Sequence, residues 1–355
     1  MALPSERPAP VYTIRPFRPA DRAEREELFR FIAARWGAAS WHADRTRWEW
    51  QFLRVPPNGG PEPPLWVLTR GDEILGEVGA IPVRLSMAGR EQAAAWAADL
   101  MIDPEYWNRG GFPLLMREFS RAYPLGLVLG MNAKAYGLFK RSRGWTDLGV
   151  IPRLERYCSW RALASPRTLL ALARQAGTAV RALRPRRPAR DLVVRPVARF
   201  DERATALWDR IVGGRIGVRR AAPWLNWKYE AQPLLVHERL QVERGEAVVG
   251  CAVLRVEEHG GERRGYLIEC FAEPAALVDV AAAAVARLRA QRVDRITCDV
   301  LDSDTEAALG ALGFVRRRSG MKFMLYAADK TLAPLVTDRP RWYITRGDAD
   351  QDRPR

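Results

Sequence analysis

The sequence is poor in the residues that build metal centres, disulfide frameworks and membrane spans. Its 355 residues include only four cysteines and three histidines. Their spacing matches neither a disulfide framework nor a metal site, so we expect reduced thiols and no metal. No apolar run approaches the roughly 18 residues that cross a bilayer, which excludes a membrane-spanning helix. Residues 1–10 lack the apolar core of a signal peptide, so we expect a disordered N-terminus and a soluble, cytoplasmic protein.

Positive charge is abundant and unevenly placed. The formal net charge is +15, and residues 161–192 contain eight arginines but only a single acid, Asp191. We expect a basic helical linker at 161–192. It is interpreted either as a connector whose arginines are solvated or as a helix on an anionic membrane surface. The same charge leaves nucleic acid open as a partner of the linker.

Internal repetition divides the remaining chain. A Trp-x-aromatic tripeptide, an Arg-Gly-acid turn between apolar strands and a Gly-aromatic pair recur in one order. They lie at 50–52, 70–76 and 144–145 in the first half and at 227–229, 244–250 and 313–314 in the second. We therefore expect two domains of one plan, at 11–160 and 193–330. The tail, 331–355, is expected to form a short strand and a frayed acidic end, or else to bring Asp348 and Asp350 to a cleft.

The segment from 103 to 115 carries the strongest functional signal. It joins an apolar run, 93–102, to a stretch in which apolar residues recur with helical spacing. Between them lie Arg109 and the glycine pair 110–111. Glycine lets main-chain N–H groups approach a ligand, and a helix N-terminus favours negative charge. The pattern is typical of an anion-binding loop, and equally of a turn that binds nothing.

The order of strand, Pro-Glu-Tyr, basic glycine loop and amphipathic helix resembles the acyl-CoA loop of the GNAT N-acetyltransferase superfamily. In that family, main-chain amides of Arg/Gln-x-x-Gly-x-Gly/Ala bind the coenzyme A pyrophosphate. Two positions depart from this pattern: Trp107 replaces Arg or Gln, and Phe112 replaces Gly or Ala. The resemblance implies that five loop residues contact the cofactor: Asn108, Arg109, Gly110, Gly111 and Phe112.

The resemblance also implies a fold and a co-substrate. We expect an α/β chain of two tandem GNAT-like domains, each a central, mostly antiparallel sheet flanked by helices. Acetyl-CoA or another acyl-CoA would be the co-substrate, without a metal. Main-chain groups at Leu100, Met101 and Ile102 would hold its pantetheine arm.

A catalytic base is suggested by the strand before the loop. By strand alternation, Asp99 shares a face with Ala97 and Met101 and lies in an otherwise apolar run. Desolvation would raise the pKa of this carboxyl group toward the range of a general base. The alternative is a structural carboxylate that accepts hydrogen bonds from Arg or Trp.

Residues 132–145 resemble the later GNAT motif, in which Asn precedes a helix and Tyr protonates the leaving thiolate. Asn132 fits, but Phe139 stands near the expected tyrosine and has no proton to donate; the resemblance places both residues at the cofactor. Tyr136, one helical turn earlier, is the candidate acid, and a core aromatic is the alternative. The second copy lacks the loop after 273–274 and has Leu309 in place of the acid, so we expect no catalysis there.

The sequence therefore predicts a GNAT-type N-acetyltransferase. It would move an acetyl or acyl group from coenzyme A to an amine or hydroxyl of a small-molecule or envelope-precursor acceptor. One alternative is a tRNA-dependent aminoacyl transferase of the tandem type, which would use the basic linker. Another is a non-catalytic acyl-CoA-binding protein, which Phe112 and Phe139 favour.

Overall fold

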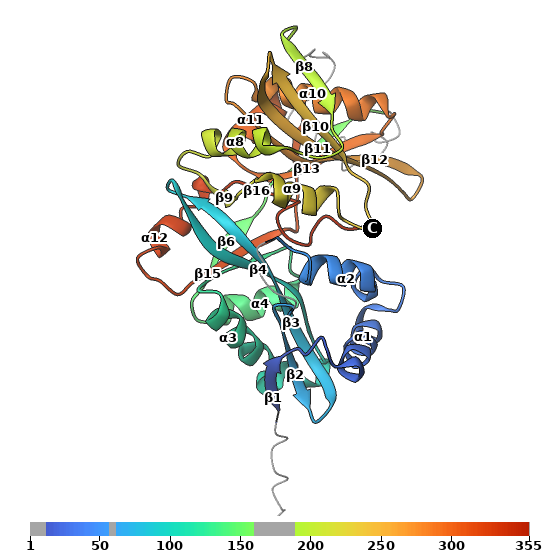
Figure 1. Ribbon diagram of the computed structural model, residues 1–355, viewed down its shortest axis with the longest axis vertical. Coiled ribbons are helices and arrows are strands. Elements are labelled where there is room, and N and C mark those ends of the chain that lie inside the picture. The colour runs from blue at the N-terminus through green and yellow to red at the C-terminus, as the bar shows by residue number, and fades with distance from the viewer. Residues whose placement is uncertain (1–11, 57–61, 160–188, 355) are drawn as a thin grey trace, which may run out of the picture.

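The computed structural model describes residues 12–56, 62–159 and 189–354. These residues form two mixed sheets, one in each half of the elongated molecule, and helices cover the faces of both (Figure 1). The N-terminus 1–10 and most of the predicted linker lie outside the described residues, so the predictions for them stay untested. Within the described part of the chain, no helix is long and apolar enough to cross a membrane.

The first sheet has the strand order β1-β2-β3-β4-β5-β15-β6, with β9 paired to β3. Its strands are β1 (Thr13–Pro16), β2 (Leu65–Arg70), β3 (Glu73–Met87), β4 (Arg90–Ile102), β5 (Leu125–Leu129), β6 (Trp145–Val150), β9 (Ile216–Val218) and β15 (Lys322–Ala327). Helices α1 (Arg22–Trp36) and α2 (Arg45–Phe52) pack on one face, and α3 (Phe112–Ala122) and α4 (Ala133–Arg141) on the other. Neighbouring strands are antiparallel except β4 and β5, which are parallel.

The second sheet has the order β14-β7-β13-β12-β11-β10-β8, with β16 paired to β13. Its strands are β7 (Arg153–Tyr157), β8 (Leu192–Pro196), β10 (Glu238–Arg244), β11 (Ala247–His259), β12 (Glu262–Ala272), β13 (Arg295–Leu301), β14 (Val315–Arg317) and β16 (Ile344–Thr345). Its helices are α8 (Glu202–Ile211), α9 (Ala222–Tyr229), α10 (Leu277–Ala290) and α11 (Ser303–Ala311); α12 (Ala333–Val336) follows β15. The repeated turns have the same left-handed glycine, with φ +59° at Gly71 and +61° at Gly245.

The predicted boundaries between the domains need correction, because the two halves exchange strands. β7, placed by sequence in the first domain, pairs with β13 and β14 of the second sheet. In return, β15 pairs with β5 and β6, and β9 pairs with β3. Local spacing identifies a strand but not the sheet that it joins. One buried core accordingly runs from α1 and α2 to α8 and α9.

The C-terminal tail is not a frayed end. After β16, residues 346–354 run between the two halves; Asp348 and Asp352 of this segment are buried, and Asp350 is half-buried. Asp348 lies 2.7 Å from Arg220 Nη2, and Asp352 lies 2.7 Å from His237 Nε2. These partners lie more than 100 positions away in sequence, so composition alone could not show that the acids are neutralised.

Candidate active site

A cavity opens where β4 and β5 diverge. The two parallel strands pair at Ala95 with Gly126 and at Trp96 with Leu127, and then separate. The resulting cavity is about 190 Å³ in volume. It is lined by 97–100 of β4, by 128–132 at the end of β5, and by Asp350, Gln351 and Arg353 of the C-terminal segment. Diverging strands leave main-chain groups without a ladder partner, and a ligand can use them.

Asp99 lies at a bulge on the wall of this cavity. The register of β4 against β3 shifts here, and Asp99 has φ +49°, in the left-handed region. The bulge breaks the alternation expected from sequence: Ala97 packs in the core under α3 and α4, whereas Met101 packs in the core under α1 and α2. A bulge inserts one residue, so it reverses the faces that follow it.

The predicted rise in the pKa of Asp99 is wrong. Arg47 of α2, whose side chain is fully buried, binds both carboxylate oxygens and lies 2.9 Å from Oδ1. Burial alone would raise the pKa of Asp99, but the Arg47 guanidinium more than offsets this and holds it below its usual value. Asp99 therefore makes the contacts of the structural alternative. We assign it the role of an ionised partner of Arg47.

Glu77 is a second buried carboxyl group, beside Asp99, that was not among the residues predicted from the sequence. It lies on β3 opposite Met101. Neither of its side-chain oxygens has a hydrogen-bond partner among the described residues. Burial, reinforced by the charge of Asp99, raises the pKa of Glu77 well above its usual value and so favours its neutral form. The sequence does contain a signal for this group, because Glu77 is an acid within the otherwise apolar run of β3.

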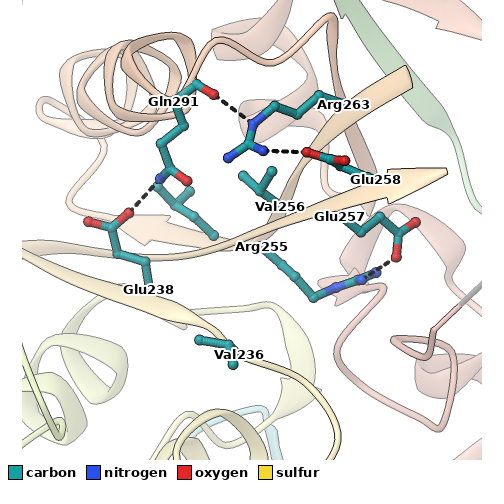
Figure 2. Close-up of a pocket in the computed structure, with 9 residues that line it drawn as sticks. Val236, Glu238, Arg255, Val256, Glu257, Glu258, Arg263 and Gln291 are labelled. Atoms are coloured by element: carbon teal, nitrogen blue, oxygen red, sulfur yellow. Dashed lines mark hydrogen bonds and ion pairs between the residues drawn. The ribbon is translucent and has the colours of Figure 1, made fainter. Parts of the chain in front are cut away.

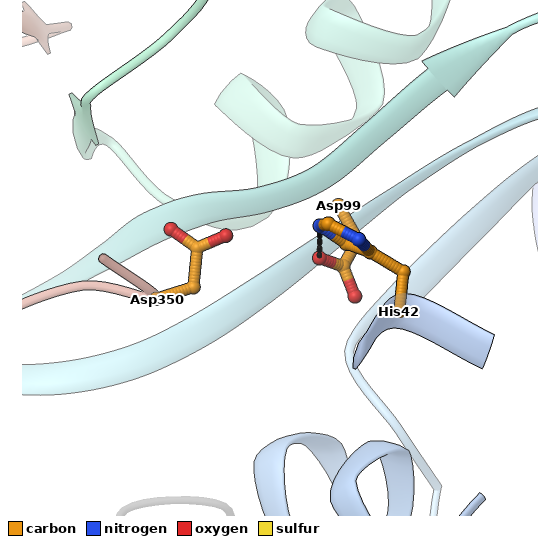
Figure 3. Close-up of side chains that lie close together, drawn as sticks. All are labelled: His42, Asp99 and Asp350. Atoms are coloured by element: carbon orange, nitrogen blue, oxygen red, sulfur yellow. Dashed lines mark ion pairs between the residues drawn. The ribbon is translucent and has the colours of Figure 1, made fainter. Parts of the chain in front are cut away.

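His42 is a further titratable side chain that the structure adds to the site. It lies in a short turn, Trp41–Ala43, and its ring stacks on Trp36 with centroids 4.0 Å apart. Its Nε2 is 4.0 Å from Asp99 Oδ1 (Figure 3). Burial lowers the pKa of His42, partly offset by the charge of Asp99, so the ring is neutral near pH 7. A buried, neutral imidazole beside a cavity can accept a proton.

The fold also brings Asp350, from the C-terminal segment, to His42 near the start of the chain. One ligand atom each of His42, Asp99 and Asp350 lies within 4.8 Å of the others (Figure 3). Cations already balance this cluster. Arg47 binds both oxygens of Asp99, and Arg353 Nη1 lies 3.4 Å from His42 Nε2. We therefore assign no metal to it.

The residues of the predicted second motif separate in the structure. Asn132 caps α4 by accepting from the Ala135 N–H at 2.9 Å, and with Phe139 it lines the cavity. Tyr136 instead points toward β6, where its hydroxyl donates a hydrogen bond to Asp147. This hydrogen bond raises the pKa of Tyr136. It is not among the residues that line the cavity.

Leu100 lines the cavity, whereas the other two residues predicted to hold the pantetheine lie beyond it. Met101 and Ile102 pair with β3 and are buried in the two cores. The prediction for their main-chain groups stays a prediction.

The glycine loop forms a π-helical turn, Trp107–Gly111, that leads directly into α3. Gly110 has φ +87° and open space where a Cβ would lie. Gly111 packs on the sheet, and a Cβ there would lie 3.0 Å from Leu68 Cδ2. The ring of Phe112 is buried in edge-to-face contact with Phe139, 5.0 Å between centroids. Its bulk is thus directed into the core beneath α3.

A basic groove lies between α3 and α4. It encloses about 570 Å³, and none of the described residues that line it is acidic. Four arginines line it: Arg117, Arg121, Arg141 and Arg143. Lys134 adds a further cation near the loop, with Nζ 4.3 Å from the centre of the Trp107 ring. This surface has the charge to hold phosphates.

Comparison with known proteins identifies the architecture. No protein-family model matches the sequence, and no curated protein matches it. A GCN5-related N-acetyltransferase from Anabaena variabilis has a TM-score of 0.63 at 14% identity, over 90% of this chain and 73% of that one. One from Kribbella flavida has 0.58 at 15%, over 92% and 73%. The Saccharomyces cerevisiae N-myristoyltransferase with bound myristoyl-CoA has 0.57 at 13%, over 91% and 81%. The chain has the tandem GNAT fold.

The predicted fold is thereby confirmed, and the two GNAT units differ in one decisive respect. In the second unit, β12 and β13 pair through 264–266 and 295–297 and then diverge, like β4 and β5. Here β16 enters the gap, where Thr345 pairs with Val300 and Ile344 with Leu301. The chain thus fills its own second cleft, while the first stays open.

A further hollow of about 300 Å³ lies on the second GNAT unit. Its charged side chains pair with one another (Figure 2). The pairs are Arg263 with Glu258 at 2.7 Å, Arg255 with Glu257 at 2.5 Å, and Gln291 Nε2 with Glu238 at 2.9 Å. This hollow is a poor candidate site.

Proposed function

We propose that the first domain transfers an acyl group from acyl-CoA to an amine or hydroxyl of a small-molecule acceptor. The observation that carries this proposal is the difference between the two GNAT units. β4 and β5 diverge around an open cavity, whereas β16 closes the gap between β12 and β13. The yeast N-myristoyltransferase, with which this chain shares the fold, binds myristoyl-CoA.

The first domain offers a surface for each part of coenzyme A. The main-chain N–H groups of the loop 107–111 and the start of α3 suit the pyrophosphate. The arginines of the groove between α3 and α4 suit the nucleotide, because guanidinium groups pair with phosphate and stack on rings. The cavity between β4 and β5 would then receive the pantetheine and the acyl group.

A short acyl chain fits this cavity best. Its volume of about 190 Å³ lies below the ~300 Å³ at which pockets for larger organic ligands begin. Phe139 and Ala135 close its wall on the side of α4. We therefore propose acetyl-CoA as the preferred donor. The measurement is the ratio of kcat/KM for acetyl-CoA to that for a long-chain acyl-CoA, and we expect it to exceed one.

His42 is the proposed general base. As the acceptor nitrogen bonds to the thioester carbon, it loses a proton to the neutral imidazole. The carbon–sulfur bond then breaks, and the thiolate leaves with the bonding electron pair and takes up a proton. Asp99, 4.0 Å from His42 Nε2, stabilises the imidazolium that forms and acts through His42. Arg47 keeps Asp99 charged for this purpose.

A second function, acyl-CoA binding without transfer, is favoured by one observation. None of the described residues that line the cavity is a tyrosine, and Tyr136 points away from it. Water would then have to protonate the thiolate. Steady release of free coenzyme A thiol in the presence of acceptor amines supports transfer, and tight binding of acetyl-CoA without any release supports the binding protein.

Isothermal titration with acetyl-CoA tests both functions together against the alternative that the loop binds nothing. Gly110→Glu places a carboxylate on the loop and should abolish binding. Gly245→Glu is the matched control: it adds the same charge at a left-handed glycine in open space on the other domain. The wild type and the control should bind alike. Absence of binding to the wild type, or equal affinity in the two variants, would contradict the proposal.

A further inference from the structure

A second hollow of about 290 Å³ adjoins the acyl cavity. The linings of the two have Gly130, Gln351 and Arg353 in common. Gln351 lies directly against Gly130, at the place that a Cβ of residue 130 would occupy. Residue 130 also has φ +73°, so only glycine fits both the backbone and the contact. The Gly130–Gln351 contact therefore stands between the two spaces.

The second hollow is strongly positive. Besides 320–321 and the shared residues, it is lined by Arg153 and Arg346, and none of the described residues in its lining is acidic. One buried carboxylate, Asp299, accepts hydrogen bonds from both arginines: Arg153 Nε is 2.8 Å from Oδ1, and Arg346 Nε is 2.9 Å from Oδ2. Two guanidinium groups thus share a single negative charge.

Arg353 adds a third cation at the junction of the two spaces. Its Nη1 lies 3.4 Å from His42 Nε2. In the part of the chain that the structure describes, Arg353 makes no ion pair with an acid. Three guanidinium groups, set against Asp299 of the second hollow and Asp350 of the acyl cavity, leave one positive charge uncompensated beside the proposed base. Such a surface repels a cationic acceptor and attracts an anionic one.

The arginines are also held in place. Arg346 is almost fully buried, and both Arg153 and Arg346 are fixed by Asp299 through Nε and a terminal nitrogen. A guanidinium oriented in this way is prepared to bind a carboxylate or phosphate without further ordering. If the anionic group of a ligand binds in this hollow, the rest of the ligand extends past Gln351 and Arg353 toward His42.

We propose that the acceptor is an anion: an amine or hydroxyl compound that also carries a carboxylate or phosphate. Arg353, with Arg153 and Arg346, binds its anionic group in the second hollow, and the nucleophile reaches the acyl cavity beside His42. The inference rests on the proposed acyl transfer and names the class of its acceptor.

Matched acceptor pairs test the proposal through coenzyme A release. Aminoethyl phosphate is compared with ethanolamine, and β-alanine with β-alanine amide, so that each pair differs in one anionic group. We expect the anionic member of at least one pair to have a kcat/KM higher by roughly tenfold or more, which is the worth of one charged hydrogen bond. The pair that shows the preference distinguishes phosphate from carboxylate.

Arg353→Gln should remove most of this preference, whereas Arg199→Gln, at an exposed arginine on the second domain, should keep it. Thermal stabilisation by inorganic phosphate gives a readout that needs no turnover: the wild type and Arg199→Gln should gain more than Arg353→Gln. Equal use of neutral and anionic acceptors, or phosphate stabilisation equal in all three proteins, overturns the proposal. If acetyl-CoA binds while these tests fail, the acyl transfer stands and only the acceptor class is wrong.

Discussion

Trp50 and Trp227 stack across the junction of the two halves, and each donates its indole N–H to the main-chain oxygen of the other. The donor–acceptor distances are 2.9 Å from Trp50 Nε1 and 3.0 Å from Trp227 Nε1. The rings are 4.7 Å apart and inclined by 15°. These residues occupy matching positions in the repeated tripeptides, so the contact is reciprocal, as in a two-fold symmetric dimer. Matching residues of the internal repeat therefore form the contact between the two halves.

The tryptophan pair is expected to stabilise the whole chain. Trp227→Ala removes a buried ring and should lower the free energy of unfolding by about 3–5 kcal/mol, whereas Trp227→Phe loses mainly the N–H donor and should cost about 1 kcal/mol. Urea denaturation measures both. Trp36→Ala is the control, because that ring is 46% exposed and should cost much less. Equal losses at residues 36 and 227 would contradict the interpretation.

Arg47 is expected to be essential because it neutralises Asp99. Arg47→Met leaves a buried carboxylate without a partner and should lower the free energy of unfolding by about 3–5 kcal/mol. Combining it with Asp99→Asn should recover part of this loss. Arg45→Met, at an exposed arginine of the same helix that pairs with Glu26, should cost at most about 1 kcal/mol. A similar cost at residues 45 and 47 would refute this role.

The pH dependence of the reaction should report His42. Burial places its pKa below the usual value, and the base must be neutral. The rate constant kcat/KM should therefore fall only when the pH drops below this lowered pKa, and it should stay level above it. His42→Gln should remove this acid limb and reduce kcat by roughly 10²–10⁴-fold. The exposed His259 provides the control, His259→Gln. An acid limb that persists in His42→Gln would exclude His42 as the base.

Acid should release the C-terminal segment. His237 and Arg255 hold the pKa of Asp352 at about 2 against the opposing effect of burial, below the ordinary value of 3.8. The stability that this carboxylate supplies is present above its ordinary pKa and is lost as the pH falls from about 4 toward 2. The lost contribution is roughly 2 kcal/mol.

Asp352→Asn should therefore flatten the dependence of unfolding free energy on pH between 2 and 5. Asp72→Asn, in the exposed turn between β2 and β3, serves as the control and should leave the curve unchanged. The same steep acid limb in Asp352→Asn as in the wild type would show that the segment is not anchored through this residue.

Local signals in the sequence were sufficient to predict the repeated architecture. Turns at Gly71 and Gly245, the helical spacing of α3 and the cap at Asn132 depend on neighbours within a few residues. The missing loop before α10 was visible by comparing the two copies.

Contacts between distant parts of the chain could not be predicted in this way. The exchange of β7 and β15 and the approach of Asp350 to His42 are set by tertiary pairing. The prediction of a raised pKa for Asp99 was wrong for a different reason. A bulge reversed the alternation of β4, and the guanidinium that lowers its pKa comes from a helix 52 positions earlier. Desolvation alone gives the wrong direction when the buried partner is unknown.

Hydrogen–deuterium exchange with and without acetyl-CoA locates the ligand and so tests whether the cavity between β4 and β5 binds it. We expect slower exchange at 97–100, 107–112 and 128–132 of the first unit when acetyl-CoA is present. Exchange should stay unchanged at the matching strands of the second unit, 267–272 and 298–302, where β16 fills the cleft. Protection confined to the second unit, or no protection at the β4–β5 divergence, would show that the first unit does not bind acetyl-CoA at this cavity.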